Sequence, residues 1–188
     1  SNPFQLKSGL RMMSGNIGRA VMKISAMDSK QMIIEAEAIV FEEQDDLIKA
    51  FKNNELNKDF IAIFPFQGPK KNGKPDLHQL TPALTILQRR GFKVGLITDG
   101  SMSGASGKIP AAIHVVPEAK DGGLISKIQT GDIILMNAIT GELKCMDQQV
   151  NNRDVRTKDN SNVFGLGREL FFNMRAQVSS SEEGASFL

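Results

Sequence analysis

The sequence has only one cysteine, Cys145, among its 188 residues. A single thiol cannot form a disulfide within the chain, and a sulfur-ligated cluster requires several cysteines. These facts exclude an internal disulfide framework and an iron–sulfur cluster built from this chain alone. Sparse cysteine is also typical of a reducing compartment, so we expect a cytoplasmic protein.

An excess of charge of one sign and long apolar runs are also lacking. Lysine and arginine number 23 against 21 aspartates and glutamates, which gives a formal net charge of +2. No run approaches the roughly 20 apolar residues that a membrane helix requires. We therefore expect neither nucleic acid nor a membrane as a partner. The length and the hydrophobic share of 40% indicate one globular domain, residues 1–188.

Hydrophobic periodicity predicts an alternation of strands and helices that is only partial. The loop 67–76 contains two prolines and two glycines, so we expect no regular structure there. The predicted elements are a strand pair at 19–27 and 31–41, helices at 42–54, 80–91 and 167–178, strands at 59–66, 92–98 and 111–116, and a hairpin of 132–139 with 141–147. This order favours an α/β fold with a mixed sheet or β-barrel and flanking helices over a doubly wound parallel sheet.

Two glycine-rich loops, 67–76 and 99–108, each follow a hydrophobic strand. Open α/β sheets bind ligands at the carboxyl ends of their strands, so we expect both loops to face one pocket. The second loop, "DGSMSGASGK", fits neither a Walker phosphate loop nor a dinucleotide fingerprint. Its successive amides at Gly104, Ser106 and Gly107, with Lys108 beside them, could still form an anion nest, and a plain surface loop is the alternative.

The first loop places Asp76 and His78 two residues apart. A carboxylate beside an imidazole can ligate a metal ion or transfer protons, but two ligands do not complete a metal site. By residue type alone, the interpretation of this pair as solvated residues of a surface loop is favoured over a functional one. The second histidine, His114, lies inside an apolar strand and fits a core position.

Five segments, spread from residue 14 to residue 186, form a recognisable set of motifs: "SGNIGRAVMKISA", "GPKKNGKPDLHQLTP", "TDGSMSGASGK", "PAAIHVVPEA" and "GRELFFNMRAQVSSSEEGAS". They resemble the C-terminal half of the dihydroxy-acid and phosphogluconate dehydratase family, and the similarity extends over nearly all of the chain. The strings "SGASGK" and "PAAIH" are similar to the phosphogluconate branch of that family. The resemblance implies a swivelling β/β/α domain at the C-terminal end of a longer dehydratase.

The resemblance also implies an activity. It predicts a hydro-lyase of the Entner–Doudoroff pathway that removes water from 6-phospho-D-gluconate to give 2-keto-3-deoxy-6-phosphogluconate. An iron–sulfur cluster, held by an N-terminal domain of the same polypeptide, and a nearby Mg²⁺ are the implied cofactors. A homodimer of the full-length enzyme is implied, and the fragment alone is expected to be inactive. The alternatives are a domain of another sugar-acid or dihydroxy-acid dehydratase and a non-catalytic anion-binding module.

The same resemblance assigns roles to individual residues. Ser103 falls on the serine proposed as the catalytic base, and Asp76 falls on a Mg²⁺ ligand. The expected substrate-binding residues, from the two loops, are His78, Asp99, Ser101, Gly104, Ser106, Gly107 and Lys108. The chain departs from the family pattern at three positions, with Ser101 in place of arginine, Lys74 in place of methionine and Asp76 in place of glutamate. Serine cannot replace the bidentate carboxylate clamp of an arginine, so these departures leave room for a changed substrate.

Overall fold

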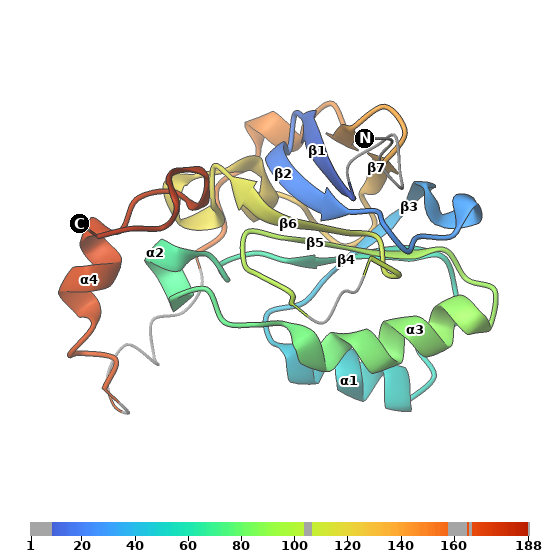
Figure 1. The fold of residues 1–188 in the computed structure, drawn as a ribbon, viewed down its shortest axis with the longest axis horizontal. Helices are drawn as coiled ribbons and strands as arrows, with labels where there is room; N and C mark the ends of the chain where they lie inside the picture. Colours follow the sequence, from blue (N-terminus) through green and yellow to red (C-terminus); the bar gives the residue numbers. More distant parts are fainter. Residues whose placement is uncertain (1–8, 104–106, 158–164, 166, 188) are drawn as a thin grey trace, which may run out of the picture.

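A computed structural model describes residues 9–103, 107–157, 165 and 167–187 of the chain. Its centre is a closed barrel in the strand order β1-β2-β6-β5-β4-β3-β7-β8 (Figure 1). The strands are β1 (Leu10–Gly15), β2 (Gly18–Lys23), β3 (Ile33–Val40), β4 (Phe60–Phe64), β5 (Val94–Thr98), β6 (Ala111–Val116), β7 (Ile133–Asn137) and β8 (Glu142–Cys145). The run from β3 through β4 and β5 to β6 is parallel, whereas β1 with β2 and β7 with β8 form antiparallel hairpins. The predicted α/β class with a mixed barrel and the hairpin near the end are confirmed.

Four α-helices are present in the described part of the chain: α1 (Gln44–Lys52), α2 (Pro69–Asn72), α3 (Thr81–Arg89) and α4 (Phe172–Gln177). Short 3-10 helices occupy η1 (Ser29–Gln31), η2 (His78–Leu80), η3 (Ala119–Asp121), η4 (Leu124–Ser126), η5 (Val150–Asn152) and η6 (Ser181–Glu183). In Figure 1, α1 and α3 lie together along one side of the barrel. The helices predicted at 42–54 and 80–91 are confirmed, and the predicted 167–178 helix is shorter than expected.

The hydrophobic core has two parts, one inside the barrel and one between the barrel and the helices, and β4 contributes side chains to both. Side chains alternate across a strand, so Ile61 and Ile63 point into the barrel interior while Phe60 and Phe64 point outward beneath the helices. Leu47 of α1 and Leu84 and Leu87 of α3 belong to the outer cluster. All five residues of β4 are buried, because the strand is covered on both faces.

The predicted pairing of the strands at 19–27 and 31–41 is wrong. Both segments form strands, but β2 pairs with β1 and β6, whereas β3 pairs with β4 and β7. Alternation specifies that a segment is a strand, but it does not specify the neighbour. Closure of the barrel places these two consecutive strands far apart in the strand order.

The loop 67–76 contains one regular element that the sequence did not predict. Pro69 begins the one-turn helix α2, and Gly73 ends it in the left-handed conformation with φ of 70°. Proline is tolerated in the first turn of a helix, where its missing N–H has no intrahelical partner to lose. The proline and the glycine therefore bound a helical turn instead of preventing one.

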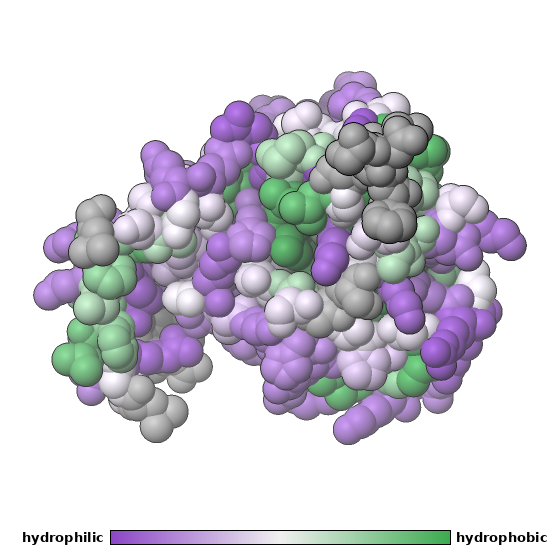
Figure 2. All heavy atoms as spheres, viewed as in Figure 1, coloured by the Kyte–Doolittle hydropathy of each residue, from purple (hydrophilic) through white to green (hydrophobic). Residues whose placement is uncertain are grey.

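The segment around α4 lies beside α2, apart from the barrel (Figure 1). Arg168 Nη1 donates to Asn72 Oδ1 at 3.3 Å, which links the two parts. Figure 2 shows hydrophobic side chains gathered on this segment, where the large exposed apolar residues are Leu170, Phe171, Phe172 and Met174. Among the described residues, no helix combines the length and apolar character needed to cross a bilayer.

Closure of the barrel generates a stability prediction at Gly15. A Cβ at this position would lie 2.0 Å from the carbonyl oxygen of Leu143, beside the point where β1 meets β8. We expect Gly15→Ala to lower the free energy of unfolding by about 1–3 kcal/mol, because the backbone must shift to accommodate the methyl group. Urea unfolding measures this change. The exposed neighbour Ser14→Ala is the matched control, and equal stability of the two variants would contradict the close approach.

Candidate active site

The two glycine-rich loops are joined by backbone pairing. Asp76 and Ser101 form an isolated parallel β-bridge, and the Leu77 amide donates to the Ser101 carbonyl at 2.9 Å. The loops follow β4 and β5, which are adjacent parallel strands, so both leave the barrel at the same end. The structure thus brings the two loops together, as expected from their positions after the strands.

Asp76 and Ser103 form the central contact between the loops. The Ser103 amide donates to Asp76 Oδ1 at 3.0 Å, and the Ser103 hydroxyl donates to Asp76 Oδ2. This hydroxyl contact is the main reason why the pKa of the Asp76 carboxyl is below its usual range. His78 Nδ1 lies 3.7 Å from Asp76 Oδ2, and 39% of the Asp76 side chain is exposed. An ionised, partly exposed carboxylate therefore lies beside a hydroxyl.

Asp99 is completely buried and anchors the loops from beneath. Its carboxylate accepts hydrogen bonds from the amides of Phe66 at 3.2 Å, Gln67 at 2.8 Å and Ala119 at 2.8 Å. Burial raises the pKa of this carboxyl, and the amide bonds oppose that rise. The sequence suggested a substrate contact for Asp99. A side chain without exposed surface cannot make one in this conformation, so we assign Asp99 a positioning role.

Gly100 allows the two loops to approach each other closely. A Cβ at this position would lie 2.7 Å from the Cβ of Gln67. The Gly100 amide donates to Thr98 Oγ1 at 2.9 Å, and its carbonyl accepts from the His114 amide at 3.0 Å. His114 is half-buried, and burial lowers the pKa of its imidazole.

The remaining predicted site residues differ in how far they are exposed to solvent. Ser101 is half-buried in the bridge, and Lys108 is exposed, with its carbonyl accepting from Gln88 at 3.3 Å. Gly107 is buried against the backbone of residues 25–26. Gly104 and Ser106 lie outside the described residues, so the anion nest stays a prediction.

Sequence reasoning missed Glu118, a buried carboxyl behind the loops. Its Oε1 accepts from the Lys70 amide at 3.2 Å, while its Oε2 has no hydrogen-bond partner in the described structure. Burial, followed by the charge of Asp99, raises the pKa of Glu118 to about 7. The only sequence signal was one glutamate in "VVPEAK" after a strand, which residue type alone does not distinguish from a surface position.

The oxygen atoms of Asp76 and Ser103 fit one side of a site for a hard divalent cation. Within the described ranges, no group of three or more histidine, cysteine or acidic side chains could hold a metal ion. Asp76 could therefore supply only part of a coordination shell. Cys145 is 4% exposed, and burial raises the pKa of its thiol, so this residue does not fit the ligation of an iron–sulfur cluster.

The fold and the site define a barrel domain that presents a carboxylate and a hydroxyl from two strand-end loops. Residues 1–185 match the family described as "Dihydroxy-acid/6-phosphogluconate dehydratase C-terminal". The chain belongs to this family, and the resemblance seen in its motifs is confirmed.

Three relatives illustrate the similarity. The chain is 52% identical to a phosphogluconate dehydratase of Rhizobium meliloti over 99% of its length, and 47% identical to one of Escherichia coli over 98%. It is 29% identical to a dihydroxy-acid dehydratase of Wolinella succinogenes over 98% of its length. These alignments cover 31%, 31% and 33% of the respective relatives, so the chain spans about a third of their length.

The anchor role of Asp99 yields a stability prediction. Asp99→Ala leaves three buried amides without an acceptor, and each such group costs about 1–3 kcal/mol. We expect the free energy of unfolding to fall by about 3 kcal/mol or more in urea titrations. Asp59→Ala is the control, because the exposed Asp59 accepts one amide bond, from Lys93. A loss no larger than that of the control would refute the anchor.

Glu118 makes stability depend on pH. Its carboxyl has a raised pKa in the folded protein, so its contribution is full below the ordinary value of 4.5 and is lost as the pH rises through about 7. We expect the free energy of unfolding to fall by up to roughly 3 kcal/mol across that interval. Urea unfolding at a series of pH values measures the slope.

Two variants control the pH experiment. Glu118→Gln removes this titrating group and should make the slope shallower, with the part due to Asp99 remaining, whereas the exposed Glu35→Gln should leave the slope as it is in the wild type. An identical slope in the wild type and Glu118→Gln would show that another group is responsible.

Proposed function

We propose that this chain is the C-terminal domain of a 6-phosphogluconate dehydratase. The enzyme would eliminate water from 6-phospho-D-gluconate to give 2-keto-3-deoxy-6-phosphogluconate. The observation that carries the proposal is the direct contact of Asp76 with Ser103, at a site formed by two loops. The relatives at 47–52% identity are named phosphogluconate dehydratases, whereas the relative named dihydroxy-acid dehydratase is 29% identical. This difference supports the phosphorylated sugar acid as substrate.

The proposal divides the chemistry between this domain and the rest of a longer polypeptide. The iron–sulfur cluster belongs to an N-terminal domain, because the single cysteine here is buried in the barrel. Asp76 would contribute to a Mg²⁺ site at the boundary between the domains. Two further parts of the proposal are that the chain is inactive alone and that the enzyme is a cytoplasmic homodimer.

In the proposed reaction, the substrate loses the proton on C2 and the hydroxyl on C3 as water, and the resulting enol converts to the ketone. Ser103 Oγ would accept the C2 proton. A serine hydroxyl is a weak base at neutral pH, so this role requires a nearby cation that favours its alkoxide. When bound at Asp76, Mg²⁺ supplies positive charge that stabilises both the alkoxide and the charge developing on the substrate carboxylate.

Asp76 has a second part in this proposal, as the group that orients Ser103. The serine hydroxyl donates to one carboxylate oxygen while the serine amide donates to the other. In the resting hydroxyl form, these two bonds fix both the backbone and the side chain of Ser103. The alkoxide has no proton to donate to Asp76, so in that form the amide bond alone positions Ser103 and its Oγ can accept the C2 proton. The lowered pKa keeps Asp76 ionised, as a cation ligand must be.

The proposal predicts a sharp loss of activity on substitution of Ser103. In the complete polypeptide, we expect Ser103→Ala to lower kcat by about 10³-fold, because general bases contribute 10²–10⁴-fold. Iron–sulfur absorbance should remain that of the wild type. The exposed Ser29→Ala is the control, and near-normal turnover by Ser103→Ala would remove the base assignment.

Substrate identity is tested in an anaerobic activity assay of the complete polypeptide. Wild-type enzyme is offered 6-phospho-D-gluconate and, separately, 2,3-dihydroxy-3-methylbutanoate. We expect product from the first, and product from the second alone would overturn the proposed substrate. Binding without turnover of either compound would favour an anion-binding module.

A further inference from the structure

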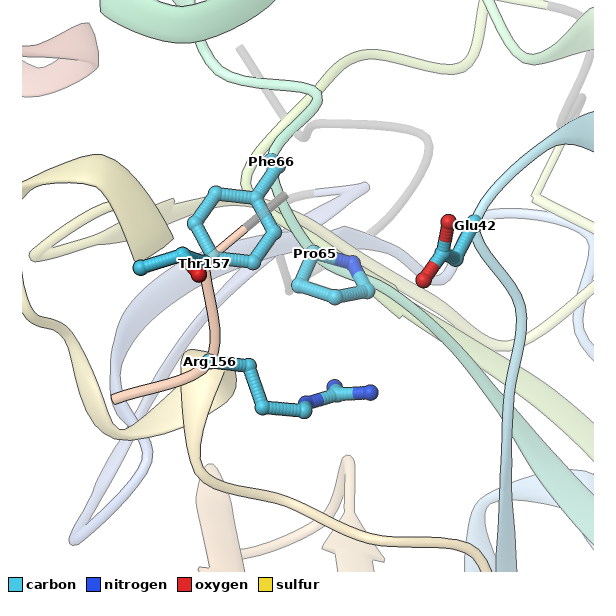
Figure 3. A pocket seen from close by; sticks show the side chains of 5 residues that line it. All are labelled: Glu42, Pro65, Phe66, Arg156 and Thr157. Carbon is cyan, nitrogen blue, oxygen red and sulfur yellow. The ribbon is translucent and has the colours of Figure 1, made fainter. Parts of the chain in front are cut away.

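A small pocket lies at the carboxyl ends of β3 and β4, and its main cation is a residue that none of the motifs includes. Its lining residues are Glu42, Pro65, Phe66, Arg156 and Thr157 (Figure 3). The cavity volume is about 160 Å³. Cavities of about 150 Å³ accommodate a molecule the size of benzene, so this pocket can hold one end of a sugar-sized ligand.

Arg156 lacks an acceptor for part of its guanidinium. Its Nε donates to the Ser126 carbonyl at 3.2 Å, whereas the buried Nη2 has no hydrogen-bond partner among the residues that the structure describes. Burial lowers the pKa of this guanidinium, and the charge of Glu42 opposes the change. Leaving a charged donor buried and unsatisfied is costly, so the position fits an anionic ligand that supplies the acceptor.

The other walls indicate what the rest of the ligand is like. Pro65 and Phe66 are buried apolar residues that suit the carbon chain of a ligand. Glu42 and Thr157 are exposed at the rim, where a carboxylate and a hydroxyl suit hydroxyl groups. A hydroxylated molecule that ends in an oxyanion matches this set better than a bare anion. Its hydroxyl groups can donate hydrogen bonds to the Glu42 carboxylate, whereas a bare anion would meet only the repulsion of that carboxylate.

The pocket adjoins the loops that carry Asp76 and Ser103. Gln67 Nε2 donates to the Glu42 carbonyl at 3.1 Å. Two residues further along, Gln44 Nε2 donates to the Asp76 carbonyl at 3.3 Å. The wall of the pocket is therefore bonded, through the side chains of Gln67 and Gln44, to the loop that carries Asp76.

We propose that this pocket binds the phosphate end of the substrate and that Arg156 selects for a phosphorylated sugar acid. The inference rests on the proposed function, since it assigns the distal end of the molecule whose C2 and C3 react near Ser103. A guanidinium forms two parallel hydrogen bonds with a phosphate, which gives both affinity and orientation.

Two measurements on the complete polypeptide test the assignment. The first is the KM and kcat for 6-phospho-D-gluconate. The second is calorimetric binding of 6-phospho-D-gluconate and of D-gluconate to the Ser103→Ala enzyme, with and without a second substitution at Arg156. Arg156→Ala removes the cation. Arg156→Gln also removes the charge but keeps an amide that can donate to Ser126, so it serves if the alanine variant is unstable.

For either variant, we expect KM and the dissociation constant for 6-phospho-D-gluconate to rise about tenfold or more, with kcat within about twofold. Binding of D-gluconate should be unchanged, and the exposed Arg89→Ala should behave as the parent enzyme. Unchanged binding of the phosphorylated ligand, or an equal loss for both ligands, would overturn the phosphate assignment. Arg156-dependent binding without wild-type turnover would instead overturn the proposed reaction and leave the subsite standing.

Discussion

The geometry of the site depends on one buried carboxylate. Asp99 binds three amides from two separate segments, residues 66–67 after β4 and Ala119 beyond β6, while its own backbone continues from β5. Without an acceptor at this point, three buried amide donors would lack partners. The loop conformations would then lose the hydrogen bonds that stabilise them. The contact of Asp76 with Ser103 is made above this anchor, by segments whose directions the anchor sets.

Maintaining this arrangement has an energetic cost that is concentrated around the site. Asp99 and Glu118 are two buried acids whose charges raise each other's energy, and Glu118 Oε2 has no partner in the described structure.

Phe66, Lys74 and His114 have positive φ values of 63°, 59° and 58°, a conformation that costs non-glycine residues on the order of 1 kcal/mol or more. Phe66 donates to Asp99, Lys74 lies two residues before Asp76, and His114 donates to Gly100. Strain of this kind is expected where a protein fixes groups for binding or catalysis.

Sequence reasoning captured the features that depend on local pattern. The stripes of α1 and α3, the hairpin of β7 and β8, and the mixed barrel followed from periodicity and turn residues. The meeting of Asp76 with Ser103 followed from the rule that loops after adjacent parallel strands share one end of the sheet.

Local pattern could not specify that β2 and β3 have different neighbours, because strand pairing is decided by closure of the whole barrel. Nor could it separate the buried Asp99 and Glu118 from surface acids, or place Arg156 beside Phe66, since each depends on contacts between residues distant in sequence.

The central claim is that the two loops form one functional unit through Asp76 and Ser103. The most direct measurement is an NMR titration of the Asp76 carboxyl in the wild type and in Ser103→Ala. The account predicts a pKa below the ordinary value of 3.8 in the wild type and a clear rise toward that value when the hydroxyl is removed. The same pKa in both proteins would show that the hydroxyl does not bind the carboxylate, and it would contradict the account.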